Sequence, residues 1–152
     1  MKDFTVFVLD DDKYFCLLMS CLMKQKELVF GVDGYKINLM VFSDMETLDE
    51  AMRIIRETKP DLVILDYYLG AQGCKASLDI LEKTIQCCAF DTDIHIISGL
   101  FPEDIRFVLA KRELQKTDIG ITLKPFSIED LMQIIKTSVN RKENAQYKRD
   151  AF

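Results

Sequence analysis

The chain alternates short apolar runs with longer stretches in which apolar residues recur at helical spacing. Each run is four to six residues long and rich in Val, Ile, Leu or Phe, as expected of a strand buried on both faces. The runs are Phe4–Leu9, Ile37–Phe42, Leu62–Leu65, Ile94–Ile97 and Ile119–Leu123. The amphipathic stretches cover residues 13–28, 47–58, 76–89, 103–114 and 127–140. This alternation predicts a doubly wound α/β fold with helices on both faces of a five-stranded parallel sheet.

Length and composition fit one such domain. The 152 residues lie within the usual range of about 100–200 residues per domain. An apolar content of 49%, with only 6 Gly and 3 Pro, argues against a disordered or fibrous chain. We expect the domain to span residues 1–142, which leaves no room for an output module. Residues 143–152 lose the apolar periodicity, so they are expected to form a frayed tail or an extension of the last helix.

The charge and the cysteine content argue against several classes of protein. With 20 basic and 25 acidic residues the net charge is −5, which argues against direct nucleic-acid binding. The sequence has neither a signal segment nor an apolar run of the ~18 residues that a membrane span needs. We therefore expect a cytoplasmic protein. The five cysteines lack a CxxC pair and a histidine cluster, so neither a disulfide framework nor a zinc site is indicated.

Polar residues stand directly after four of the five apolar runs. In an open α/β sheet the ligand site lies outside the carboxyl ends of the strands, so these residues are expected to converge at one edge. They are Asp10, Asp11 and Asp12 after the first run, Asp66 after the third, Ser98 after the fourth and Lys124 after the fifth.

The chemistry of this set points to phosphoryl transfer. Carboxylates that lie close together repel one another and raise each other's pKa unless a cation neutralises them. A set of oxygen donors without His or Cys favours Mg²⁺. Lys124 adds a positive charge and Ser98 a hydrogen bond for a tetrahedral oxyanion. One carboxylate can then serve as the nucleophile that forms an acyl phosphate.

Four strings along the chain carry a family resemblance: VFVLDDD at 6–12, PDLVILDYYL at 60–69, IHIISG at 94–99 and TLKPF at 122–126. In this order they resemble the receiver domain of response regulators in bacterial two-component signalling, of the single-domain, chemotaxis-regulator-like kind. The resemblance covers about residues 3–140. It implies a flavodoxin-like sheet with strand order 2-1-3-4-5.

The resemblance also implies a role for individual residues. These roles are Asp66 as phosphoacceptor, Asp10 and Asp11 as the acidic pair that organises Mg²⁺, Tyr68 as a main-chain carbonyl ligand of the metal, Ser98 as the hydroxyl switch, and Lys124 as the phosphate contact. Because three aspartates are consecutive, the resemblance leaves open which two of them organise the metal. We choose the two that directly follow the apolar run and leave Asp12 to cap the first helix.

The partners that the resemblance implies are proteins. A histidine kinase or a histidine phosphotransfer protein would supply the phosphoryl group, with slow autodephosphorylation and no classical enzyme turnover. An unidentified downstream protein would bind the phosphorylated form. The face formed by residues 103–114, 119–123 and 127–140 would hold this target or a second copy of the chain in a homodimer. No membrane or nucleic-acid partner is expected.

Two departures from the family pattern keep alternatives open. Gly70 stands where proline is usual, and Ile121 stands where an aromatic residue usually couples rotamer state to phosphorylation. One alternative is therefore a binding module with the same fold that signals without phosphorylation. A Mg²⁺-dependent phosphohydrolase with an aspartate nucleophile is less favoured, because DDDKY lacks its signature. His95 lies within an apolar run, so we expect a structural role and not phosphorelay.

Overall fold

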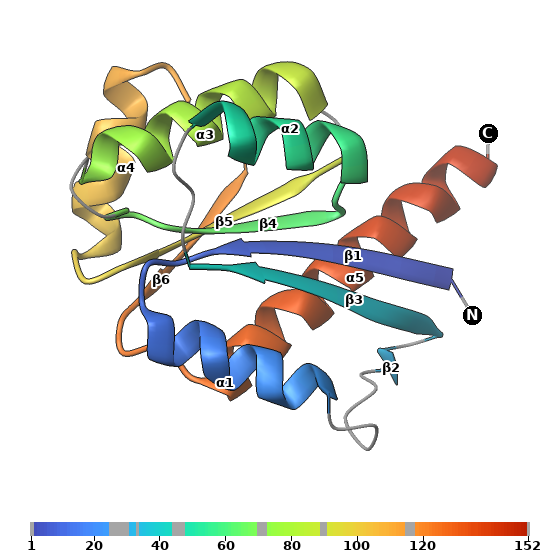
Figure 1. The fold of residues 1–152 in the computed structure, drawn as a ribbon. Coiled ribbons are helices and arrows are strands. Elements are labelled where there is room, and N and C mark those ends of the chain that lie inside the picture. Colours follow the sequence, from blue (N-terminus) through green and yellow to red (C-terminus); the bar gives the residue numbers. More distant parts are fainter. Residues whose placement is uncertain are drawn as a thin grey trace.

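Five parallel strands form the centre of the molecule, and helices cover both of their faces (Figure 1). The computed structural model describes residues 2–24, 31–32, 34–43, 48–69, 73–88, 91–114 and 118–151. The strands are β1 (Lys2–Leu9), β2 (Gly31–Val32), β3 (Tyr35–Phe42), β4 (Leu62–Asp66), β5 (Asp93–Ser98) and β6 (Ile119–Leu123). The helices are α1 (Lys13–Lys24), α2 (Leu48–Thr58), α3 (Cys74–Cys88), α4 (Pro102–Lys111) and α5 (Ile128–Asp150).

The sheet has the strand order β2-β3-β1-β4-β5-β6. The strands β3, β1, β4, β5 and β6 pair in parallel, so the expected five-stranded order 2-1-3-4-5 and the flavodoxin-like fold class are confirmed. The short strand β2 adds an antiparallel partner to β3 that the sequence pattern did not predict. Residues 25–28 of the first predicted helix lie outside the described residues.

The inner strands β1 and β4 bury both of their faces, which explains why their apolar runs are continuous. In β1, Phe7 and Leu9 pack into the core under α2, α3 and α4. Val6 and Val8, which alternate with them, pack into a second core with Leu131 and other residues of α1 and α5. Figure 1 shows these two helical layers above and below the sheet. None of the helices within the described residues is long and apolar enough to cross a bilayer.

Helix α5 begins at a capping box, in which the Ser127 hydroxyl and the Asp130 carboxylate each accept the other's backbone N–H. The helix then continues to Asp150, well beyond the end of its apolar periodicity. Charged contacts accompany this last part, including an ion pair between Arg149 and Asp91 at 3.2 Å. An exposed pair of this kind contributes at most about 1 kcal/mol.

Gly120 of β6 leaves room for the imidazole of His95. The two residues are paired across β5 and β6, and a Cβ at residue 120 would lie 2.7 Å from His95 Cε1 and closer still to Nδ1. We therefore expect Gly120→Ala to lower the free energy of unfolding by about 1–3 kcal/mol, as overpacked sites do. Urea denaturation measures this change. Gly99→Ala is the matched control, because a Cβ there meets nothing within 4 Å, and equal destabilisation of both variants would contradict the close contact.

His95 is expected to make stability fall in mild acid. Burial, together with the charge of Arg141, lowers the pKa of His95 from 6.5 to about 4. Because the folded pKa lies below the unfolded one, the stabilisation is present above pH 6.5 and is lost as the pH falls toward 4. The loss approaches about 3 kcal/mol. Urea denaturation at a series of pH values should give a shallower decline for His95→Gln, and parallel curves would contradict this assignment.

Candidate functional site

Three carboxylates meet at the carboxyl ends of β1 and β4. One oxygen from each of Asp10, Asp11 and Asp66 lies within 4.8 Å of the others. The parallel register pairs Leu9 with Leu65, so the residues that follow them emerge side by side. Asp10 and Asp66 are each only 3% exposed, while Asp11 is exposed to solvent. The three residues form an acidic cluster that is reached from solvent on the Asp11 side.

Lys124 brings a positive charge to the acidic cluster from the end of β6. Its Nζ lies 3.2 Å from Asp66 Oδ2 and 4.0 Å from Asp10 Oδ2. Its backbone N–H donates a 2.7 Å hydrogen bond to the carbonyl of Ser98, which fixes the chain where β6 ends beside β5. The lysine that the sequence placed at a strand end thus contacts the aspartate that the sequence singled out.

Ser98 ends β5, and its side chain is fully buried. Its Oγ accepts a 2.8 Å hydrogen bond from the backbone N–H of Leu100. The hydroxyl therefore holds the first turn of the connection to α4. Since β5 lies between β4 and β6, this turn stands at the same sheet edge as Asp66 and Lys124.

Tyr68 follows the acidic cluster in the connection after β4. Its side chain is 48% exposed, and its ring meets the buried ring of Tyr67 edge to face, with 5.1 Å between centroids. Tyr67 is fixed by its backbone, which donates to the Ile97 carbonyl and accepts from the Ser77 hydroxyl. The connection is thus anchored next to Asp66, while the metal-ligand role of the Tyr68 carbonyl stays a prediction.

Asp12 has a different task from its two neighbours. Its Oδ1 accepts hydrogen bonds from the backbone N–H groups of Tyr14 at 3.0 Å and Phe15 at 3.1 Å. These are N–H groups of the first turn of α1, which an aspartate side chain commonly caps. The Asp12 backbone N–H in turn donates to Asp10 Oδ1 at 2.8 Å. The three aspartates after β1 thus have two tasks: Asp10 and Asp11 belong to the acidic cluster, and Asp12 caps α1.

One contact at the acidic cluster escaped the sequence analysis. The thiol of Cys16, which is buried in α1, donates to the backbone carbonyl of Asp10 at 3.2 Å. This hydrogen bond ties the first turns of α1 to the end of β1. A cysteine at a core-facing helix position gives no sequence signal for such a contact, because apolar packing explains the same residue equally well.

The electrostatics of the acidic cluster are those of a site short of positive charge. The pKa of Asp66 is raised to about 7, first by burial and then by the charge of Asp10, while Lys124 opposes both. Burial alone would lower the pKa of Lys124, but the carboxylates of Asp10 and Asp66 outweigh burial and raise it. One ammonium group therefore does not neutralise the carboxylates, and an additional cation would stabilise their charged forms.

The donors in the acidic cluster fit a hard divalent cation. They are carboxylate oxygens, two of them shielded from water and one accessible to it. Mg²⁺ is commonly held by one or two carboxylates together with waters and phosphate oxygens. The chemistry of this donor set is therefore consistent with Mg²⁺ beside a phosphoryl group.

Comparisons with known proteins give likeness at the level of the fold. No family model matches the chain. The chain is similar to the Probable C4-dicarboxylate response regulator DctR of Bacillus subtilis (strain 168), with 28% identity over 89 residues, which cover 58% of this chain and 35% of that protein. It thus spans about a third of the length of this relative.

Solved structures align over nearly the whole chain. The signal receiver domain of the DNA binding response regulator protein (merR) from Colwellia psychrerythraea 34H has a TM-score of 0.60 at 19% identity, covering 91% of this chain and 99% of that chain. The response regulator domain of Thermotoga maritima CheB gives 0.58 at 17%, with coverages of 91% and 98%. The adenylate cyclase from Rhodopirellula baltica gives 0.64 at 12%, with coverages of 98% and 96%. The chain therefore has the fold of response regulator receiver domains, as the sequence predicted.

Proposed function

We propose that the chain is a response regulator receiver that accepts a phosphoryl group on Asp66 from a histidine kinase or a histidine phosphotransfer protein. The observation that carries the proposal is the position of the Lys124 ammonium, 3.2 Å from Asp66 Oδ2, at the same strand ends as Asp10 and Asp11. The receiver fold supports a signalling role over that of a classical enzyme. In this proposal residues 1–142 form the receiver, residues 143–152 extend it, and the protein works in the cytoplasm.

The proposed transfer uses the Asp66 carboxylate as nucleophile. One of its oxygens attacks the phosphorus of a phosphohistidine, the P–N bond breaks, and the electron pair of that bond leaves with the imidazole. The product is an acyl phosphate on Asp66. Lys124 balances the negative charge of the incoming oxygens, and Ser98 exchanges its bond from Leu100 for one to a phosphoryl oxygen.

Four ligands would hold Mg²⁺ in this proposal: the carboxylates of Asp10, Asp11 and Asp66, and the main-chain carbonyl of Tyr68. When bound, the ion supplies positive charge to the phosphoryl oxygens. Positive charge from the ion would also stabilise the ionised forms of Asp10 and Asp66 in the resting protein, because both carboxylates are buried within one cluster. The metal-binding proposal therefore rests on the charge of this chain's own residues.

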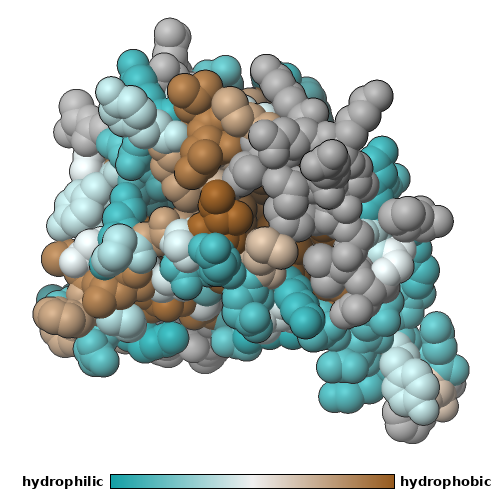
Figure 2. Space-filling view, turned by 90° about the horizontal axis from the view of Figure 1, so that it is seen from below, coloured by the Kyte–Doolittle hydropathy of each residue, from teal (hydrophilic) through white to brown (hydrophobic). Residues whose placement is uncertain are grey.

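The phosphoryl donor would dock beside α1. This helix begins next to the acidic cluster and exposes apolar side chains, with Leu17 at 62% and Leu18 at 48% exposure. Figure 2, which looks onto the α1 and α5 side of the molecule, shows hydrophobic surface along α1. Apolar surface of this kind at the rim of a reactive site suits a transient protein partner.

Output would pass through the face of α4, β6 and α5. The turn held by Ser98 leads directly into α4, whose N-cap residue Phe101 is 65% exposed and whose Phe107 is 63% exposed. Leu123 of β6 and Met132 of α5 add further exposed apolar surface, at 39% and 42%. A change at Ser98 upon phosphorylation would reorient this surface. The occupant is a downstream protein or a second copy of the chain.

Incubation with acetyl phosphate tests the proposed function. In the presence of Mg²⁺ the intact mass should increase by one phosphoryl group, and EDTA in place of Mg²⁺ should prevent the increase. No modification and no Mg²⁺ binding would instead support a phosphorylation-independent binding module. Turnover of a generic phosphoester would support a phosphohydrolase.

A further inference from the structure

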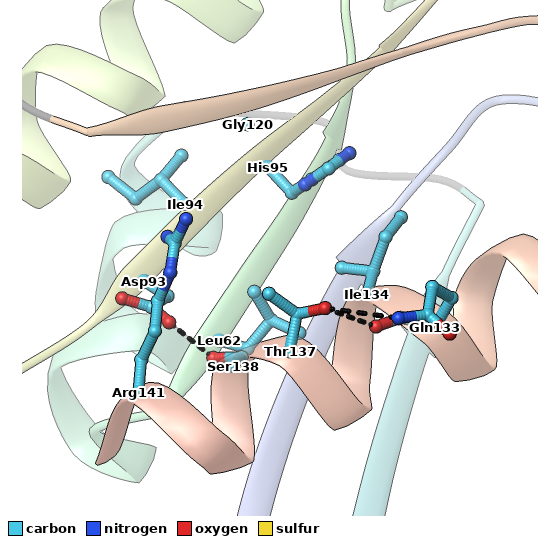
Figure 3. A pocket seen from close by; sticks show the side chains of 10 residues that line it. All are labelled: Leu62, Asp93, Ile94, His95, Gly120, Gln133, Ile134, Thr137, Ser138 and Arg141. Carbon is cyan, nitrogen blue, oxygen red and sulfur yellow. Dashed lines mark hydrogen bonds between the residues drawn. The ribbon is translucent and has the colours of Figure 1, made fainter. Parts of the chain in front are cut away.

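A second candidate site lies between α5 and the strands β5 and β6, away from the acidic cluster. It is a cavity of about 240 Å³, and Figure 3 shows its lining side chains. Gly120 and His95 form part of the strand side of the cavity. Gly120 has no side chain, and the imidazole of His95 lies across it, held by a 2.6 Å hydrogen bond to Thr122. Space therefore remains between this part of β5 and β6 and helix α5.

Two opposite charges line this cavity, and in the described part of the chain no ion pair joins them. Arg141 of α5 contacts Asp118 at 3.3 Å, but the Asp118 carboxylate is 84% exposed, so this pair is weak and screened. Asp93 of β5 accepts a 2.5 Å hydrogen bond from Ser138 through Oδ2. The remaining guanidinium N–H groups and Asp93 Oδ1 can therefore bind a ligand.

The rest of the lining is neutral. Leu62 and Ile134 supply the apolar side chains of the lining, whereas Ile94 contributes its backbone because its side chain packs into the core on the opposite face of the sheet. His95 also lines the cavity, and its imidazole carries no charge at neutral pH, because burial and the charge of Arg141 lower its pKa to about 4. The cavity thus has one positive group, one negative group and an aliphatic wall.

The size and the access of the cavity set the class of ligand. It is smaller than the roughly 300–1,000 Å³ of pockets for drug-sized molecules, so it suits a small metabolite. Gln133 and Thr137, which line it together with Arg141, are exposed residues of α5, so a ligand can enter along the helix. In Figure 3 the Arg141 side chain rises from α5 beside Asp93 and Ile94 of β5. A single small molecule can reach both charges.

We propose that this cavity binds a free α-amino acid with an aliphatic side chain. The Arg141 guanidinium pairs with the ligand's carboxylate, and Asp93 pairs with its ammonium group. The side chain of the ligand packs against Ile134 and Leu62. A zwitterion pairs with both charges at once. A simple anion would bring negative charge next to Asp93, and a simple cation would bring positive charge next to Arg141. The inference is independent of phosphorylation, because none of these residues belongs to the acidic cluster.

Titration of the full chain with L-leucine, followed by amide NMR, tests this proposal. L-leucine should give saturable shifts around Asp93, Gly120 and Arg141. L-leucine methyl ester lacks the carboxylate charge and N-acetyl-L-leucine lacks the ammonium charge, so each should bind at least roughly tenfold more weakly. Absence of saturable shifts with L-leucine would overturn the proposal. Equal binding of all three compounds would also overturn it, because a purely apolar cavity would then explain the result.

Two variants assign the charges to their residues. Arg141→Gln and Asp93→Asn should each weaken L-leucine binding by roughly tenfold or more. Arg106→Gln is the matched control, because Arg106 is an exposed residue of α4 outside the cavity, and it should leave binding unchanged. Unchanged binding in both cavity variants would overturn the assignment. The ligand series on the natural chain keeps the test decisive if a variant folds poorly.

Discussion

Replacing Asp66 by Asn is expected to abolish phosphorylation by acetyl phosphate. The asparagine amide cannot form an acyl phosphate. The asparagine side chain nevertheless has the same size as the aspartate side chain that it replaces. The fold should be retained, because the buried carboxylate already has a pKa raised to about 7 and is not a favourable charge in the resting protein. Intact-mass measurement after incubation with acetyl phosphate and Mg²⁺ reads out the modification directly.

Asp12→Asn is the matched control for this experiment. Asp12 stands at the same sheet edge, but its carboxylate caps α1 through Tyr14 and Phe15, a task that asparagine performs about equally well. This variant should therefore be phosphorylated like the natural chain. An Asp66→Asn variant that still gains one phosphoryl group would show that another residue is the acceptor.

Asp10→Asn should have opposite effects on metal binding and on stability. It removes one of two carboxylates that are each 3% exposed within the acidic cluster. Mg²⁺ binding should weaken by roughly tenfold or more, about 1.4 kcal/mol. In EDTA the variant should be more stable than the natural chain by about 0.5–2 kcal/mol, because removal of the Asp10 charge relieves its repulsion with Asp66. The backbone N–H of Asp12 can still donate to the asparagine oxygen, as it does to Asp10 Oδ1.

Calorimetric Mg²⁺ titration and urea denaturation measure the two effects separately. Asp12→Asn again serves as the control and should change neither quantity strongly. Loss of stability together with unchanged Mg²⁺ affinity in Asp10→Asn would contradict the account, because Asp10 would then be a structural residue and not part of a metal site.

The sequence predicted the central sheet because its inner strands, β1 and β4, are buried on both sides. A strand with helices on each face needs an apolar residue at every position, so Val6 and Phe7 gave the same signal although they face different cores. The same topology made the site predictable. Once the strands are parallel, the residues that follow them meet at one edge, which is where Asp66 and Lys124 lie 3.2 Å apart.

Features that depend on single contacts could not be predicted in this way. Strand β2 has two residues, too few for any periodicity. For residues 143–152 the sequence left a frayed tail and an extension of the last helix equally open, and helix α5 continues to Asp150, where charged residues such as Arg149 and Asp91 make contacts. The thiol of Cys16 and the carbonyl of Asp10 meet through the packing of α1 against β1, a tertiary contact that neither residue's sequence neighbours reveal.

The most direct test of the central claim is to locate the phosphoryl group. Borohydride reduces an acyl phosphate on aspartate to the corresponding alcohol, which peptide mass spectrometry can place on a single residue. After treatment with acetyl phosphate and Mg²⁺, the account predicts this mark on Asp66 and its absence when EDTA replaces Mg²⁺. A mark on Asp10 or Asp11, or a stable phosphoryl group on Ser98, would contradict the assignment of Asp66 as the acceptor.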